Sequence, residues 1–109
     1  MNNIYFSLNK SDITKDSEFE VNKMAKLLKK SSTMKIEIQG HTDKVGGDEH
    51  NLQLSYERAN SVRDFLISKG INRKRIKIKG FGSRKPVASN KTEAGKAKNR
   101  RTEFLVLEK

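Results

Sequence analysis

Apolar residues recur along the chain at two different spacings, which predict helices in some stretches and strands in others. From Ser17 to about Lys30 they fall at positions i, i+3, i+4 and i+7, and Ser17 with Glu20 is typical of a capping box. A similar stripe from Asn51 to Lys69 predicts a second helix. Gly70 followed by an isoleucine predicts the end of that helix.

Shorter stretches alternate between apolar and polar residues, as a strand with one buried face does. Four strands are expected, together with a short helical turn at Thr92–Lys98; the strands are Ile4–Leu8, Met34–Gln39, Ile76–Gly80 and Thr102–Leu107. The last is apolar on both faces, which indicates an interior strand. The order β-α-β-α-β-(α)-β predicts an α+β fold, a two-layer sandwich with helices on a small mixed sheet. Without a repeat or a linker, residues 1–109 are expected to form one domain.

Composition adds a strong positive charge to this picture. The 109 residues include 24 Lys and Arg but 13 Asp and Glu, which gives a formal net charge of +11. Such a balance indicates an anionic partner, and charge alone leaves nucleic acid, a membrane surface and an acidic polymer open. No apolar run is long enough to span a bilayer, and the start of the chain has no export signal.

Enzyme and metal chemistry find little support in the residue pattern. His41, Asp43, Asp48 and His50 could each ligate a metal, but no complete zinc-like set occurs. His41 near Ser55 is the one pairing of base and hydroxyl, and nothing positions it. We therefore predict a non-enzymatic domain without metal or cofactor.

A short match to a nucleic-acid motif also fails. Lys79–Gly82 fits the opening of the RNA-recognition signature, but Ser83–Pro86 replaces the stretch that would carry the next stacking aromatic residue. With five Phe, two Tyr and no Trp, the chain offers no stacking platform. We predict that nucleic acid is not the partner.

Asp43 and Arg58 are candidates for a charged site. Asp43 follows a predicted strand and Arg58 lies in the next helix, so both are expected on one rim of the sheet. They could form an ordinary surface salt bridge, or they could flank a zwitterion, with Asp43 on the ammonium and Arg58 on the carboxylate. Spacing alone favours the salt bridge. The basic run Lys96–Arg101 offers a further arginine for a carboxylate.

Two long motifs resemble the signature of the OmpA-like peptidoglycan-binding domain. The first comprises Gly40–Asp43, Gly46, Asn51, Leu54, Ser55, Arg58, Ala59 and Val62. The second comprises Gly80–Gly82, Pro86, Asn90, Thr92, Gly95 and Asn99–Arg101. The resemblance extends over Ile4–Leu107, and Lys96 departs from the arginine that many members carry there.

The resemblance implies non-covalent binding of peptidoglycan through the meso-diaminopimelate of its peptide stem. It favours the zwitterion interpretation, with the ammonium on Asp43 and the carboxylate on Arg58. The implied ligand-binding residues are Asp43, Arg58, Thr42, Asn51, Leu54, Ser55 and Arg100. Weaker binding to lysine-containing stems is expected, because lysine lacks the second carboxylate.

The resemblance also implies a periplasmic location, within an outer-membrane or envelope protein. The missing export signal leads us to expect a domain excised from a longer exported parent, whose other parts attach it to the membrane. Two rival functions are a basic nucleic-acid-binding domain and a wall hydrolase with a metal at His41 and His50.

Overall fold

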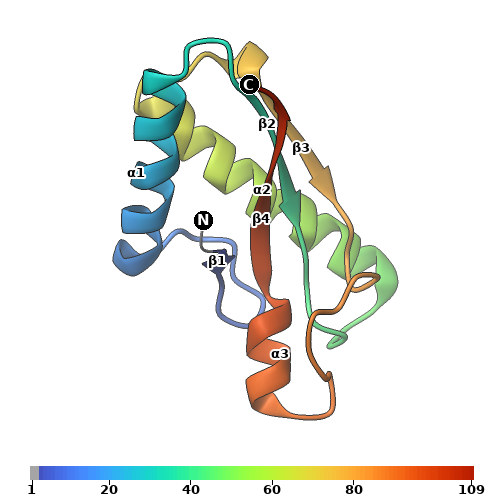
Figure 1. The fold of residues 1–109 in the computed structure, drawn as a ribbon. Coiled ribbons are helices and arrows are strands. Elements are labelled where there is room, and N and C mark those ends of the chain that lie inside the picture. Colours follow the sequence, from blue (N-terminus) through green and yellow to red (C-terminus); the bar gives the residue numbers. More distant parts are fainter. Residues whose placement is uncertain (1–2) are drawn as a thin grey trace.

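The computed structural model describes residues 3–109, in which three α-helices and a short 3-10 turn accompany a four-stranded sheet (Figure 1). In chain order the elements are β1 (Ile4–Tyr5), α1 (Lys15–Lys30), β2 (Lys35–Gly40), α2 (Asp48–Ser68), η1 (Arg73–Arg75), β3 (Ile76–Gly80), α3 (Glu93–Asn99) and β4 (Arg101–Glu108).

The strand order is β1-β4-β2-β3. Strands β2 and β3 are parallel, whereas β4 runs antiparallel to both β1 and β2, so the sheet is mixed. Helices α1 and α2 supply the buried layer against one face of the sheet. The predicted fold class is therefore confirmed.

The core lies between this sheet face and the two long helices. Ile36 and Ile38 of β2 are fully buried, as are Val62 and Leu66 of α2 and Leu28 of α1. Burying one such side chain contributes roughly 1.5–3 kcal/mol. The packing holds α2 across the sheet, and this places the start of α2 beside the carboxyl ends of β2 and β3.

Helix α1 begins earlier than the capping box at Ser17 predicts. Thr14 is the N-cap, and its Oγ1 accepts a hydrogen bond from the Ser17 backbone N–H at 3.2 Å. Ser17 is thus the third helical residue, and its hydroxyl donates to the Tyr5 carbonyl oxygen at 3.4 Å. The earlier start brings Asp16 into the first turn, where a carboxylate interacts favourably with the helix dipole.

The predicted end of α2 is confirmed. Gly70 has a left-handed φ of +96°, and its N–H donates to Ile67 O at 2.9 Å. The N–H of buried Ile71 donates to Leu66 O at 3.2 Å, which completes a Schellman motif. The helix begins at Asp48 rather than Asn51.

The outer strands differ in part from the prediction. β4 is an interior strand as expected, but Leu105 and Leu107 are 46% and 40% exposed on the uncovered face of the sheet. β1 is shorter than Ile4–Leu8, because the backbone beyond it turns so that the carbonyl of Ser7 accepts a hydrogen bond from Arg58. Among the helices of the described chain, none has the length and apolar character that a membrane crossing requires.

Candidate functional site

The predicted site begins where β2 ends and α2 crosses very close to the sheet. A Cβ added to Gly40 would lie 1.8 Å from the backbone oxygen of Ser55, and one added to Gly80 would lie 2.7 Å from Ser55 Oγ. Glycine is required at both strand ends so that α2 can approach. This contact sets α2 directly against the loop that carries Asp43.

Backbone hydrogen bonds join the two sequence motifs at this point. The N–H of Phe81 donates to Gly40 O at 3.0 Å, and the N–H of Thr42 donates to Gly82 O at 2.9 Å. The hydroxyl of Ser55 accepts from Gly82 N–H at 2.9 Å. The segments after β2 and after β3 are therefore held together against α2.

Arg58 of α2 is fully buried beneath this junction. Its Nε donates to Lys10 O at 2.8 Å, its Nη1 to His41 O at 3.0 Å, and its Nη2 to Ser7 O at 3.0 Å. Burial lowers the pKa of Arg58 to about 10, the nearby Asp43 carboxylate opposes this shift, and Arg100 adds to it. The guanidinium therefore remains charged at neutral pH, and it ties the chain after β1 to the end of β2.

Asp43 pairs with Arg100. Its Oδ2 lies 3.1 Å from Arg100 Nη1, and its Oδ1 accepts a hydrogen bond from Val45 N–H at 2.9 Å. Arg100 also donates through Nε to the Phe6 carbonyl oxygen at 2.9 Å. The salt bridge between Asp43 and Arg58 that spacing favoured is not formed. Asp43 and Arg58 are 2% and 0% exposed, and the Arg100 side chain keeps 16% exposure, so a buried carboxylate and guanidinium lie beside a second, partly exposed guanidinium.

The remaining predicted residues lie in the loop after β2 and in the first turns of α2. Thr42 is buried, and its hydroxyl donates to Asp43 O at 2.8 Å. Asn51 and Leu54 are buried in the first turns of α2. The hydroxyl of Ser55 donates to Leu52 O at 2.7 Å and also accepts from Gly82 N–H, so it joins α2 to the segment after β3.

The two histidines lie in different surroundings. His41 is 1% exposed, and its ring stacks on Phe81 with centroids 5.2 Å apart. Its Nε2 lies 3.2 Å from a Glu103 carboxylate oxygen that Arg101 already holds at 2.8 Å. Burial, followed by the charge of Arg101, lowers the pKa of His41 to about 4. His50 is exposed, with its Nε2 3.1 Å from the side-chain oxygen of Asn9.

Binding of a metal ion would require a group of ligating side chains close together. Within residues 3–109, no three His, Cys, Asp or Glu side chains lie close enough together to hold a metal ion. The pair of histidines that the hydrolase hypothesis requires is therefore not joined by a third ligand.

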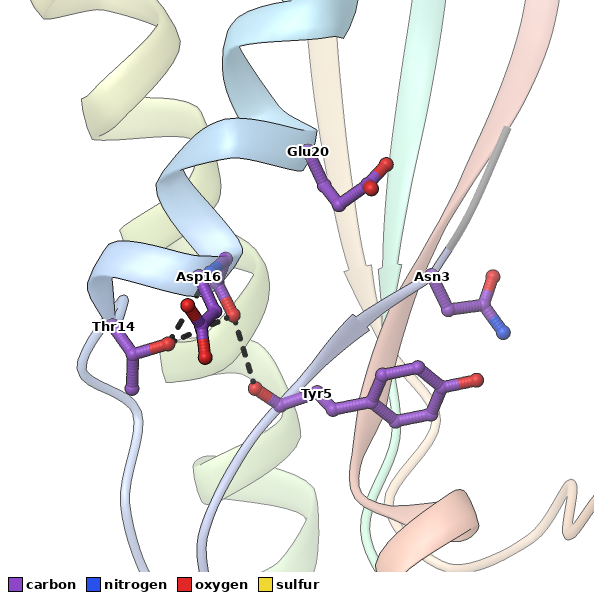
Figure 2. Close-up of a pocket in the computed structure, with 6 residues that line it drawn as sticks. Asn3, Tyr5, Thr14, Asp16 and Glu20 are labelled. Carbon is purple, nitrogen blue, oxygen red and sulfur yellow. Dashed lines mark hydrogen bonds between the residues drawn. The ribbon is translucent and has the colours of Figure 1, made fainter.

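Two cavities adjoin the chain that follows β1. The first, about 490 Å³, lies between β1 and the first turns of α1, where Asp16 and Glu20 lie across from Tyr5 (Figure 2). None of the seven predicted ligand-binding residues lines it; its lining residues are Asn3, Tyr5, Thr14, Asp16, Ser17 and Glu20. The second, about 460 Å³, is lined by Arg100 together with residues of β1, the following loop and α3.

Sequence reasoning missed the part that backbone carbonyls take in the site. Ser7 and Lys10 contact Arg58 through main-chain oxygens, and Phe6 contacts Arg100 in the same way. Main-chain groups leave no residue-type signal, so these contacts follow only from the fold.

Comparison with known proteins identifies the family. The OmpA family matches residues 5–100. Outer membrane porin F of Pseudomonas aeruginosa is 38% identical over 104 residues, which cover 94% of this chain and 30% of the porin. A peptidoglycan-associated lipoprotein of Buchnera aphidicola is 39% identical over 104 residues, covering 95% of this chain and 60% of that protein. The chain spans about a third of the length of the porin relatives.

Solved structures show the same fold. The crystal structure of the peptidoglycan-associated lipoprotein from Burkholderia pseudomallei has a TM-score of 0.93 at 31% identity, covering 97% of this chain and 90% of that one. The C-terminal domain of Helicobacter pylori MotB has a TM-score of 0.91 at 24% identity, covering 100% and 86%, and supports the fold alone. With a family match over most of its length and a relative of similar size above 30% identity, the chain belongs to the OmpA family.

Proposed function

We propose that this domain binds peptidoglycan non-covalently, through the meso-diaminopimelate of the peptide stem. It would act in the periplasm, as the wall-anchoring part of a longer outer-membrane or envelope protein. Membership of the OmpA family supports this, as do relatives named peptidoglycan-associated lipoprotein and outer membrane porin.

The observation that carries the proposal is the cluster of buried Arg58 and Asp43 with the partly exposed Arg100. Two positive charges and one negative charge leave the cluster with one uncompensated positive charge. An uncompensated charge away from water is costly. A ligand carboxylate would neutralise it, and the stem of peptidoglycan carries carboxylates.

The hydrogen-bonding capacity of the cluster fits both ends of a zwitterion. Each carboxylate oxygen of Asp43 accepts one hydrogen bond, and a carboxylate has about four acceptor positions, so an ammonium can be added. Three of the five N–H groups of Arg58 are used. The remaining N–H groups, one on each terminal nitrogen, belong to a fully buried guanidinium, so a carboxylate bound bidentately would have to replace carbonyl partners.

Ligand entry requires the segment Ser7–Lys10 to move. Its carbonyl groups lie on the guanidinium of Arg58, which is fully buried. A stem carboxylate would take the place of one or both of these carbonyls. Thr42 and Asn51 would help to hold the ligand, Leu54 and Ser55 would form the wall of the site, and Arg100 would supply the second cation.

Titration calorimetry with three synthetic stem peptides tests the proposal on the unmodified domain. The peptides carry meso-diaminopimelate, its side-chain carboxamide, or lysine at the same position. We expect the first to bind most tightly, because the other two leave a guanidinium without its carboxylate. Equal affinity for all three would overturn the proposed specificity, and absence of binding to purified wall sacculi would overturn the function.

Variants complete the test. Asp43→Asn keeps the shape of the side chain but removes its charge, so ammonium binding should weaken at least tenfold. Asp64→Asn, which removes one negative charge from an exposed residue in the second half of α2, is the matched control. Release of soluble muropeptides from sacculi during incubation would show catalysis and contradict a purely binding role.

A further inference from the structure

Basic residues from five parts of the chain gather at the end of the molecule opposite the Asp43 cluster. We call it the basic end, and its members are Lys29, Lys30, Lys35, Lys69, Arg73, Lys74, Arg75 and Lys109. The acidic residue Glu108 lies among them, with its carboxylate 3.8 Å from Lys35 Nζ. A third of the 24 basic residues therefore lie at one end of the molecule.

Direct contacts bring these distant parts of the sequence together. Arg75 of η1 donates through Nη2 to Leu28 O and Ser31 O at 2.7 and 2.6 Å, and through Nε to Met34 O at 3.0 Å. Its guanidinium thereby joins η1 to the end of α1 and the start of β2. The Thr33 hydroxyl donates to Lys109 O at 2.6 Å, which adds the end of β4.

The directions of the elements place the proposed wall-binding site at the other end. α1 and α2 finish at the basic end, while β2 starts there and runs down to His41–Asp43 (Figure 1, top to bottom). Asp43 and the basic end are thus separated by the length of β2. A partner at the basic end would not obstruct the Asp43 cluster.

Helix dipoles explain some of these cations but not all of them. Lys29 and Lys30 lie in the last turn of α1, and Lys69 is the C-cap of α2, so each interacts favourably with a helix C-terminus. Arg73, Lys74 and Lys35 are exposed and have no such role. Their concentration beside other cations costs repulsion that an anionic partner would relieve.

We propose that the basic end docks on the headgroups of an anionic phospholipid surface. Apart from Arg75, all of its cations are exposed, and most are lysines whose flexible stems follow a fluid layer of phosphates. Leu107, 40% exposed on the neighbouring strand end, supplies an apolar side chain for the interface. Base stacking is not favoured by Phe65, because its ring is partly buried and has Lys69 Nζ 5.2 Å from its centroid.

Vesicle flotation tests this docking without peptidoglycan, so the result is independent of the proposed function. The probes are phosphatidylcholine vesicles with and without about one quarter phosphatidylglycerol. The domain should float with the anionic vesicles alone, and the bound fraction should fall steeply between about 0.05 and 0.5 M salt. Binding that is equal for both vesicles, or absent from both, would overturn the proposal.

Two triple variants with the same change of net charge locate the surface. Lys30→Gln/Arg73→Gln/Lys74→Gln should weaken vesicle binding by roughly tenfold to a hundredfold. The matched control Lys44→Gln/Lys91→Gln/Lys98→Gln alters exposed residues elsewhere and should bind nearly as the unmodified domain does. Equal losses in both variants would show a response to net charge alone and contradict the assignment.

Two further measurements complete the design. Circular dichroism checks that each variant is folded, and the single variant Lys74→Glu repeats the test should the triple variant unfold. A short DNA duplex that displaces the domain from vesicles, and binds it more tightly at equal salt, would assign the basic end to nucleic acid and overturn the lipid proposal.

Discussion

Replacing Arg58 by alanine should destabilise the domain far more than the loss of a surface ion pair. The guanidinium is fully buried and donates to three backbone carbonyls, those of Ser7, Lys10 and His41. Each hydrogen bond from a charged donor is worth about 1.5–3 kcal/mol. Discounting for carbonyls that recover water in the variant, we expect a loss of about 3–5 kcal/mol in the free energy of unfolding. A surface salt bridge would be worth about 0–1 kcal/mol.

Urea unfolding followed by circular dichroism measures this loss. Arg84→Ala removes an exposed arginine from a loop and should leave the midpoint nearly unchanged. Arg58→Lys keeps the charge but lacks the planar fork, so its stability should lie between that of Arg58→Ala and that of the unmodified domain. A loss below about 1 kcal/mol in Arg58→Ala would refute the reasoning.

Three further predictions concern the surroundings of the site. Because the pKa of His41 is lowered to about 4 from 6.5, the unfolded chain binds more protons between these values. The free energy of unfolding should therefore rise with pH across that window, by about 3 kcal/mol, and His41→Gln but not His50→Gln should flatten the urea-midpoint profile. Gly40→Ala should lower the thermal midpoint strongly, because the new Cβ would collide with the Ser55 carbonyl oxygen of α2, and we expect a loss of about 3 kcal/mol in the free energy of unfolding. Gly47→Ala is the control: open space surrounds that position, and the loss should be less than about 1 kcal/mol. Asn99→Ala should lower the free energy of unfolding, measured with urea, by about 2–4 kcal/mol. The buried Asn99 amide accepts hydrogen bonds from the N–H groups of Val87 and Ala88 and donates to Ala88 O. A loss below about 0.5 kcal/mol would contradict this prediction.

Periodicity predicted the fold well because most elements bury one face against a single core. The stripe of α2 and the alternation of Ile36 and Ile38 both end in fully buried side chains. The predictions failed where local chemistry offers alternatives of equal merit. Thr14 and Ser17 are both good N-caps; in the structure Thr14 takes that position and the Ser17 hydroxyl donates to the Tyr5 carbonyl oxygen.

The sequence predicted which residues could form the candidate site but not how they contact one another. Asp43 and Arg58 lie near each other as spacing implied, yet Asp43 pairs with Arg100, which is 57 residues away. Sequence spacing measures proximity along one strand-loop-helix unit. It does not show that Arg100, at the end of α3, lies beside Asp43. Nor does it show that the carbonyls of Ser7 and Lys10 accept hydrogen bonds from Arg58.

The location of the positive charge on the surface also could not be predicted from the sequence. A net charge of +11 alone is compatible with any anionic partner. The residues of the basic end lie far apart in the sequence, at positions 29–30, 35, 69, 73–75 and 109. Strand direction brings them together: β2 and β3 start at one end because they are parallel, and β4 finishes there because it is antiparallel to β2. Helices α1 and α2 must end where the following strands begin, since their connections are short. The concentration of charge is therefore a consequence of topology, and it places the two proposed binding surfaces at opposite ends of the domain.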